Sequence, residues 1–154
     1  MLRHAGEIQL FHQLHFVSIF LGATLGDGMN QKPSPVVLVV EDDWLLRLLA
    51  VEIVEDAGLV AVEAANADEA IAILERRVDI ALIFSDVDMP GIMDGLKLAH
   101  AVRRRWPPIK IIIVSGKTRL SDAELPSDTR FFSKPYSVPG MISELRSLVA
   151  PSST

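Results

Sequence analysis

From residue 36 onward, short apolar runs rich in β-branched residues alternate with stretches in which apolar residues recur every three or four positions. The runs are typical of strands buried on both faces, and the periodic stretches are typical of helices. This alternation predicts an α/β domain with a parallel five-stranded sheet and helices on both of its faces. The predicted strands are 36–40, 59–64, 80–84, 109–114 and 131–133, and the predicted helices are 44–57, 66–76, 95–106 and 138–149.

The first predicted helix has an apolar face. Leu45, Leu48, Leu49 and Ile53 lie at helical spacing, so we expect this face to pack inward, and Gly58 is a suitable stop signal. Trp44 and Trp106 flank helices and are interpreted as packing residues. Asn66, followed three residues later by Glu69, resembles a capping box at the start of the second helix. Between residues 115 and 131 the helical signal is weak.

Residues 1–35 differ in character and are interpreted as an N-terminal extension, poorly ordered or forming a short helix, ahead of a domain at 36–150 and a tail at 151–154. Leu10, Leu14, Val17 and Leu21 have the spacing of a short amphipathic helix. The clean apolar run at 16–25 is about half of the roughly 20 residues that a membrane helix needs. A secretory signal and a true start at Met29 are alternatives for this stretch.

Composition narrows the classes of function. The chain has 154 residues, a length typical of one domain, no cysteine and a formal net charge of -5. The lack of cysteine excludes disulfide frameworks, thiolate metal sites and cysteine nucleophiles. An acidic balance argues against a nucleic-acid-binding face and suits carboxylates gathered around a cation.

Charged and polar side chains follow four of the predicted strands. The carboxyl ends of parallel strands meet at one edge of the sheet, so we expect these side chains to lie close together. Clustered carboxylates repel one another unless a cation joins them, and an oxygen-rich site with few protein ligands suits Mg²⁺. The side chains are those of Glu41, Asp42 and Asp43 after the first strand, Asp86 and Asp88 after the third, Ser115 after the fourth and Lys134 after the fifth.

These residue types fit phosphoryl transfer to a carboxylate. Asp86 is the predicted nucleophile, which would form an aspartyl phosphate. Glu41 and Asp42 are the predicted metal-site acids, while Lys134 would offset negative charge from the other side. Ser115 would contact a phosphoryl oxygen.

Taken together and in order, the motifs resemble the response-regulator receiver (CheY-like) domain of two-component phosphorelay systems, over residues 36–149. Asp42 and Asp86 are 44 positions apart, as expected for that family. The motifs are Val39-Val40-Glu41-Asp42, Ser85-Asp86-Val87-Asp88-Met89-Pro90-Gly91, Asp94-Gly95, Val114-Ser115-Gly116 and Lys134-Pro135.

The resemblance implies a flavodoxin-like, doubly wound sheet in the order 2-1-3-4-5. It implies Mg²⁺-dependent transfer of a phosphoryl group to Asp86 from a histidine kinase or a histidine phosphotransfer protein. The main-chain carbonyl of Asp88 would complete the protein ligands of the metal, and Ser115 and Phe131 would be the switch residues. A cis peptide is expected between Lys134 and Pro135.

At the level of the whole protein, the resemblance implies a stand-alone, cytoplasmic regulator that is not an enzyme. It would signal by contact with an unidentified downstream protein, and it allows a dimer that forms on phosphorylation. No nucleic-acid or membrane partner is expected. Because Gly116 is small, the phosphate is expected to be open to water and short-lived.

Two departures from the family pattern stand out. The interval from Asp86 to Gly95 is one residue longer than the common spacing, because Ile92 and Met93 both precede Asp94. The interval from Ser115 to Lys134 is a few residues short, so the fourth helix of the family is expected to be truncated or irregular.

Two alternatives to a phosphorylated receiver remain open. The first is a haloacid-dehalogenase-like phosphatase that uses Asp86 and Asp88, although that class needs an acidic pair after the lysine and only Glu144 follows Lys134. The second is a receiver-like module that binds partners without being phosphorylated.

Overall fold

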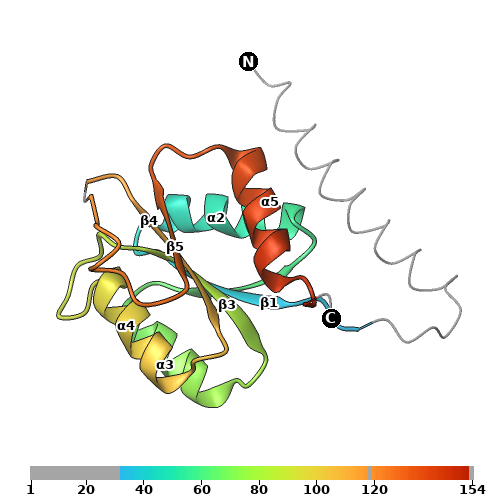
Figure 1. Ribbon diagram of the computed structural model, residues 1–154, viewed down its shortest axis with the longest axis horizontal. Coiled ribbons are helices and arrows are strands. Elements are labelled where there is room, and N and C mark those ends of the chain that lie inside the picture. The colour runs from blue at the N-terminus through green and yellow to red at the C-terminus, as the bar shows by residue number, and fades with distance from the viewer. Residues whose placement is uncertain (1–31, 118, 153–154) are drawn as a thin grey trace, which may run out of the picture. The chain divides into compact units, whose positions relative to one another are not determined.

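The computed structural model describes residues 32–117 and 119–152, and within them the chain from Ser34 onward is one compact unit. Strands and helices alternate along it (Figure 1). The strands are β1 (Val36–Val40), β2 (Val60–Ala64), β3 (Ile80–Asp86), β4 (Lys110–Ser115) and β5 (Thr129–Ser133); the helices are α2 (Trp44–Asp56), α3 (Ala67–Arg76), α4 (Gly95–Arg105) and α5 (Val138–Val149).

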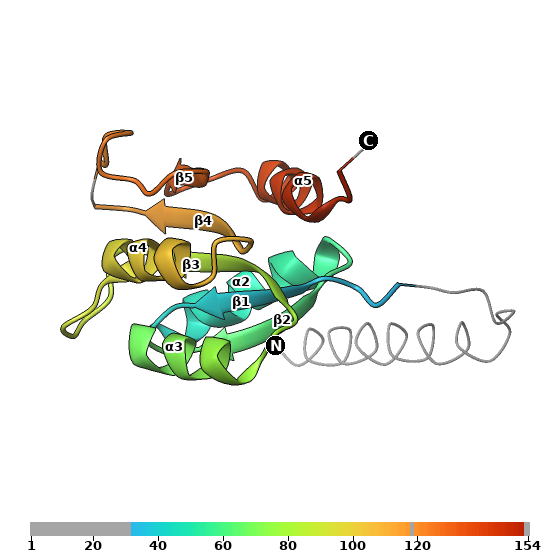
Figure 2. The ribbon, with the colours of Figure 1, turned by 60° about the horizontal axis from the view of Figure 1, so that its bottom comes forward.

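The five strands form one parallel sheet in the order β2-β1-β3-β4-β5, which Figure 2 shows from one edge to the other. Helices α2 and α5 cover one face of the sheet, and α3 and α4 cover the opposite face (Figure 1). The predicted fold class and strand order are therefore confirmed.

The core has two halves, one on each face of the sheet. Strand β1 shows why: all five of its residues are buried, and successive side chains point to opposite faces. Val36, Leu38 and Val40 pack with α3 and α4, whereas Val37 and Val39 pack with α2 and α5. A continuous apolar run is what a strand with two covered faces requires.

Polar side chains fix where the helices begin. Asp43 accepts hydrogen bonds from the backbone N–H groups of Leu45 and Leu46 at the start of α2, at 2.9 and 3.0 Å. Asn66 accepts one from the Glu69 N–H at 2.8 Å, as predicted, whereas the Glu69 carboxylate accepts from Ala65, one residue before the cap, and not from Asn66. Each bond satisfies an N–H that has no partner within the helix.

The prediction for the apolar face of α2 is confirmed for Ile53 and wrong for the leucines. Leu45, Leu48 and Leu49 are 48%, 47% and 47% exposed, and Trp44, expected to pack, is 70% exposed. The side of α2 that meets the sheet is instead defined by Ala50, Ile53, Val54 and Ala57, at the same helical spacing but rotated around the axis. Trp106 does pack against the core, as expected.

The ends of several elements also differ from the prediction. Strand β3 continues to Asp86 and β4 to Ser115, so both residues belong to the sheet rather than to the loops after it. Strand β5 begins at Thr129, two residues earlier than expected. Of residues 116, 117 and 119–128, none is helical, which goes further than the truncated or irregular helix expected there.

The predictions for residues 1–31 lie outside the described residues, and the division into extension, domain and tail stays a prediction. Within the described part of the chain, none of the helices has the length and apolar character needed to cross a bilayer.

Candidate functional site

Four strands bring the predicted site residues to one edge of the sheet. Glu41 follows β1 directly, Asp86 ends β3, Ser115 ends β4 and Lys134 follows β5. The strand register aligns these ends: Val40 is paired with Ser85, Asp86 with Val114, and Ser115 with Ser133. The parallel sheet therefore gathers side chains that lie up to 93 positions apart in the sequence.

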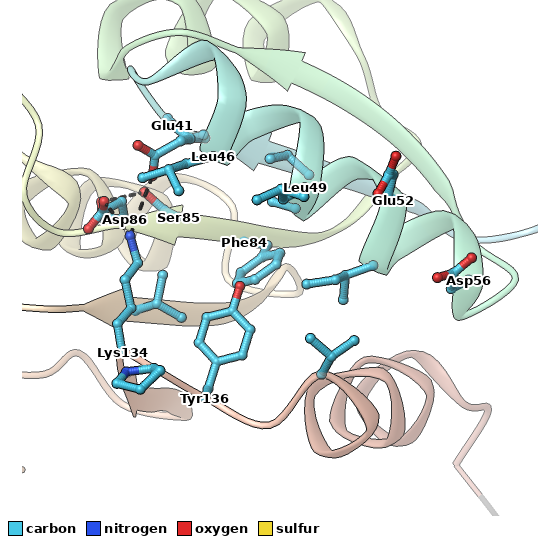
Figure 3. A pocket seen from close by; sticks show the side chains of 17 residues that line it. Glu41, Leu46, Leu49, Glu52, Asp56, Phe84, Ser85, Asp86, Lys134 and Tyr136 are labelled. Atoms are coloured by element: carbon cyan, nitrogen blue, oxygen red, sulfur yellow. Dashed lines mark hydrogen bonds and ion pairs between the residues drawn. The ribbon is translucent and has the colours of Figure 1, made fainter. Parts of the chain in front are cut away.

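Lys134 joins the two buried carboxylates at this edge (Figure 3). Its Nζ lies 2.9 Å from Asp86 Oδ2 and 3.8 Å from Glu41 Oε2. Glu41 and Asp86 are each only 6% exposed, and Asp86 also accepts a hydrogen bond at Oδ1 from the Asp88 N–H at 3.1 Å. With both acids ionised, one ammonium faces two buried carboxylates, so the site carries excess negative charge.

The protonation of Glu41 reflects this crowding. Burial, together with a side-chain hydrogen bond to Asp86 and repulsion from it, raises the pKa of Glu41 to about 8. Burial alone would lower the pKa of Lys134, but its hydrogen bond to Asp86 and its attraction to both carboxylates raise that pKa above the usual value. A proton on Glu41 is therefore one way to relieve the excess charge, and a bound cation is another.

The donor chemistry suits Mg²⁺. Glu41 and Asp86 offer hard carboxylate oxygens, and Mg²⁺ is commonly held by one or two carboxylates and several waters. Asp42 is exposed beside them, whereas Asp43 is engaged at the start of α2. Over residues 32–117 and 119–152, no three His, Cys, Asp or Glu side chains are grouped closely enough to hold a metal by themselves. A cation here would thus need water and a main-chain oxygen in addition to the carboxylates.

Ser115 does not point at Asp86. Its hydroxyl donates a hydrogen bond to Asp88 Oδ2 at 2.8 Å. For a receiver, sequence reasoning gave Asp88 only a main-chain role and missed the bond between its side chain and Ser115, because a contact across 27 positions leaves no local pattern. Phe131, the predicted switch residue, is half-buried against the side of the core that contains α3 and α4.

Gly95 packs directly against the backbone of Asp86. A Cβ at this position would collide with the Asp86 carbonyl oxygen and with the Val87 Cα, and the Gly95 N–H donates to the Val87 carbonyl at 3.0 Å. Only glycine allows helix α4 to begin so close to the end of β3. The predicted motif Asp94-Gly95 therefore supports the backbone of the site.

A cavity of about 570 Å³ leads from the site along the space between α2 and α5 (Figure 3). Asp86, Glu41 and Lys134 lie at one end of it, and Glu52 and Asp56 line it further along α2. Apolar side chains make up most of the remaining wall. Sequence reasoning missed this lining, which includes Leu46, Leu49, Phe84, Tyr136 and Val138.

The cis peptide expected between Lys134 and Pro135 is present. The acidic pair that a haloacid-dehalogenase-like phosphatase would need is not found in the described residues. Glu144, the acid that follows Lys134, lies in α5 and pairs with Arg130 at 3.2 Å.

Comparisons with known proteins agree with this geometry. The family model of the response regulator receiver domain matches residues 37–145. The response regulator receiver protein CpdR of Brucella abortus is 28% identical over 116 residues, which are 73% of this chain and 95% of CpdR. A response regulator receiver protein from Pseudomonas putida has a crystal structure that superposes with a TM-score of 0.64 at 31% identity, covering 75% of this chain and 97% of the other.

Similarity extends to one module of a larger protein. The sensor kinase CckA of Brucella abortus is 34% identical over 120 residues, but these are 75% of this chain and only 13% of CckA. The matched region is thus a small part of that kinase. The family match, which covers more than two thirds of the sequence, settles the classification: this chain belongs to the response regulator receiver domain family of two-component systems.

Proposed function

We propose that Asp86 accepts a phosphoryl group from a phosphohistidine of a histidine kinase or a histidine phosphotransfer protein, and that the chain then signals by protein contact. The observation that carries this proposal is the buried ion pair between Lys134 and Asp86 at 2.9 Å. It places a counter-charge on the carboxylate that would attack, at the mouth of a cavity wide enough to admit a reacting group.

The transfer needs few groups. One Asp86 carboxylate oxygen forms a bond to phosphorus while the phosphorus–nitrogen bond breaks, and the electron pair of that bond returns to the imidazole ring. The Lys134 ammonium offsets the negative charge that develops on the acyl phosphate. The Asp88 N–H orients Asp86 through its hydrogen bond to Oδ1. Ser115 supplies a hydroxyl donor on the neighbouring strand.

Bound Mg²⁺ would offset charge on the phosphoryl oxygens. Glu41, Asp42, Asp86 and the main-chain carbonyl of Asp88 are the groups that would hold it. The chain's own contribution is a site with more carboxylates than cations, in which Glu41 must lose its proton for both acids to bind metal.

Intact-mass spectrometry tests the proposal. Incubation of the full chain with Mg²⁺ and either acetyl phosphate or phosphoramidate should add one phosphate. Asp86→Asn should give no adduct, whereas Asp122→Asn, which removes an exposed carboxylate from the loop after β4, should leave the adduct unchanged. No adduct on the native chain, or an equal adduct on Asp86→Asn, would contradict the proposal and favour a module that binds partners without phosphorylation.

A further inference from the structure

The side chain of Asp88 has no part in the proposed transfer, yet it holds one of the residues that the transfer needs. Ser115 Oγ lies 2.8 Å from Asp88 Oδ2, and the Lys117 N–H lies 3.3 Å from the same Oγ. A carboxylate can only accept hydrogen bonds and a backbone N–H can only donate one. The hydroxyl hydrogen of Ser115 is therefore directed toward Asp88, and its oxygen faces Lys117.

We infer that the Asp88 carboxylate is a latch: it holds the Ser115 hydroxyl by a hydrogen bond until a phosphoryl group on Asp86 competes for that hydroxyl. The inference rests on the proposed function, because the group toward which the Ser115 hydroxyl would turn is a phosphoryl group on Asp86. A hydroxyl has one hydrogen, so Ser115 cannot give a linear hydrogen bond to Asp88 and to a phosphoryl oxygen at the same time. The Asp88 carboxylate and a phosphoryl oxygen are both charged acceptors, so their hydrogen bonds to the hydroxyl are of similar strength. The bond to Asp88 therefore opposes movement of the Ser115 hydroxyl toward the phosphoryl group.

The latch is anchored on the phosphorylation site itself. The Asp88 N–H donates to Asp86 Oδ1 at 3.1 Å, so the backbone of the latch residue is tied to the carboxylate that would be modified. The two acids on either side of Val87 thus each hold a donor: Asp86 holds Lys134, and Asp88 holds Ser115. A phosphoryl group on Asp86 would attract both donors at once.

Movement of Ser115, at the end of β4, would affect the edge strand β5. The Ser115 carbonyl accepts a hydrogen bond from the Lys134 N–H at 2.9 Å, and Ser115 is in register with Ser133 of β5. Phe131 lies on the same strand, two residues before Ser133. The latch therefore sits at the point where a change at β3 passes to β4 and β5, and its strength sets how readily the unphosphorylated chain adopts the switched position.

A double-mutant cycle tests the latch in the full chain. Binding of beryllofluoride, a phosphoryl mimic, is titrated at saturating Mg²⁺ for the native chain, Asp88→Ala, Ser115→Ala and the double variant. Removal of Asp88 changes local charge in both backgrounds, and the cycle subtracts that effect. The latch predicts that Asp88→Ala tightens binding about tenfold more when Ser115 is present than when it is absent. An equal change in both backgrounds would overturn the inference.

Asp88→Asn separates the hydrogen bond from the charge. Its amide oxygen can still accept the Ser115 hydroxyl, so with Ser115 present Asp88→Asn should tighten beryllofluoride binding less than Asp88→Ala does. Equal tightening by the two variants would mean that loss of the charge, and not loss of the hydrogen bond, acts at this position, which would overturn the latch.

Hydrogen exchange of the metal-free, unphosphorylated chain provides a readout that does not depend on Asp86 chemistry. Loss of Asp88 should remove the acceptor that holds the Ser115 hydroxyl hydrogen, loosen the Ser115 side chain and speed exchange of the Lys117 amide severalfold. If no chain binds beryllofluoride, the proposed function fails, and the exchange measurement alone decides the latch. An unchanged Lys117 amide in Asp88→Ala would overturn it.

Discussion

The two faces of the sheet are closed to different degrees. On the face of α3 and α4, the helices turn their apolar side chains inward, and Leu74 and Leu98 are 2% and 0% exposed. On the face of α2 and α5, α2 leaves Leu45, Leu48 and Leu49 half-exposed, and a cavity of about 570 Å³ remains beside α5. The face of α3 and α4 is closely packed, whereas the face of α2 and α5 has exposed apolar side chains and a cavity next to Asp86.

The cavity next to Asp86 lies on the face of α2 and α5, whereas the closed apolar core lies on the face of α3 and α4. Arg146 of α5 donates hydrogen bonds to the Ala57 and Asp56 carbonyls at 3.1 Å each, which fastens α5 to the end of α2 far from Asp86. The cavity runs from Asp86 at one end toward Asp56, in the last turn of α2, at the other (Figure 3). Substitutions on the two faces should therefore have unequal effects.

The largest effect is expected on the closed face. Leu98→Ala removes a side chain with no exposure and leaves a cavity, so the free energy of unfolding should fall by about 2–5 kcal/mol. Urea denaturation followed by circular dichroism measures this loss. A loss below about 1 kcal/mol would mean that the α4 side is as loosely packed as the α2 side.

The next effect concerns the glycine between the site and α4. Gly95→Ala places a Cβ against the Asp86 carbonyl oxygen, which should cost about 1–3 kcal/mol and reduce phosphorylation at Asp86. Gly116→Ala is the matched control, because its Cβ would lie 3.7 Å from the Lys134 Cβ, at an ordinary contact distance. Denaturation and intact-mass assays on both variants should separate them; equal losses would contradict the close approach.

A smaller effect is expected from pH at the mouth of the cavity. The pKa of Glu41 is about 8 in the folded chain against 4.5 for an ordinary glutamate, so between these values the folded state binds more protons than the unfolded state. Stability of the metal-free chain should therefore be highest at low pH within this range and fall, by on the order of 1–2 kcal/mol, as pH rises toward 8.

Glu41→Gln tests the origin of that slope. The amide cannot ionise, so the decline between pH 5 and 8 (a range of about 3 units) should flatten in the variant. Urea titrations at several pH values in the presence of a chelator would measure it. A native-like slope in Glu41→Gln would assign the effect to another group.

The smallest effect is expected on the exposed side of α2. Leu48→Ala should change stability by no more than about 0.5 kcal/mol, because the side chain is already 47% exposed and alanine favours the helix. Ile53, on the opposite side of the same helix, is 7% exposed and lines the cavity, so Ile53→Ala should cost more than Leu48→Ala and less than Leu98→Ala, about 1–3 kcal/mol. Similar losses for the two variants would show that the outer side of α2 is covered in solution.

Most of the fold could be predicted because each strand carries its own signal. The run at β1 is short, apolar throughout and made of Val and Leu, a pattern typical of a strand with two covered faces. The outward face of α2 could not be predicted, because leucines at 45, 48 and 49 match helical spacing as well as Ala50, Ile53 and Val54 do. Which stripe meets the sheet depends on the rotation of the helix, which packing decides.

Some features of the site could likewise be predicted from the sequence, and others could not. Asp86, Glu41 and Lys134 could be brought together from sequence, because parallel strands end at one edge and the order of the motifs is distinctive. The bond between Ser115 and Asp88 could not, since it depends on how two loops approach each other. The raised pKa of Glu41 likewise depends on burial, which no local pattern records.

The close contact between Gly95 and Asp86 has a mechanical consequence. No side chain separates the end of β3 from the first turn of α4, so the two backbones are in direct contact. The opposite side of the site is connected through the longer, rotatable side chains of Lys134 and Ser115. A displacement that begins at Asp86 would therefore reach α4 through a backbone contact, but β4 and β5 through side chains that can rotate.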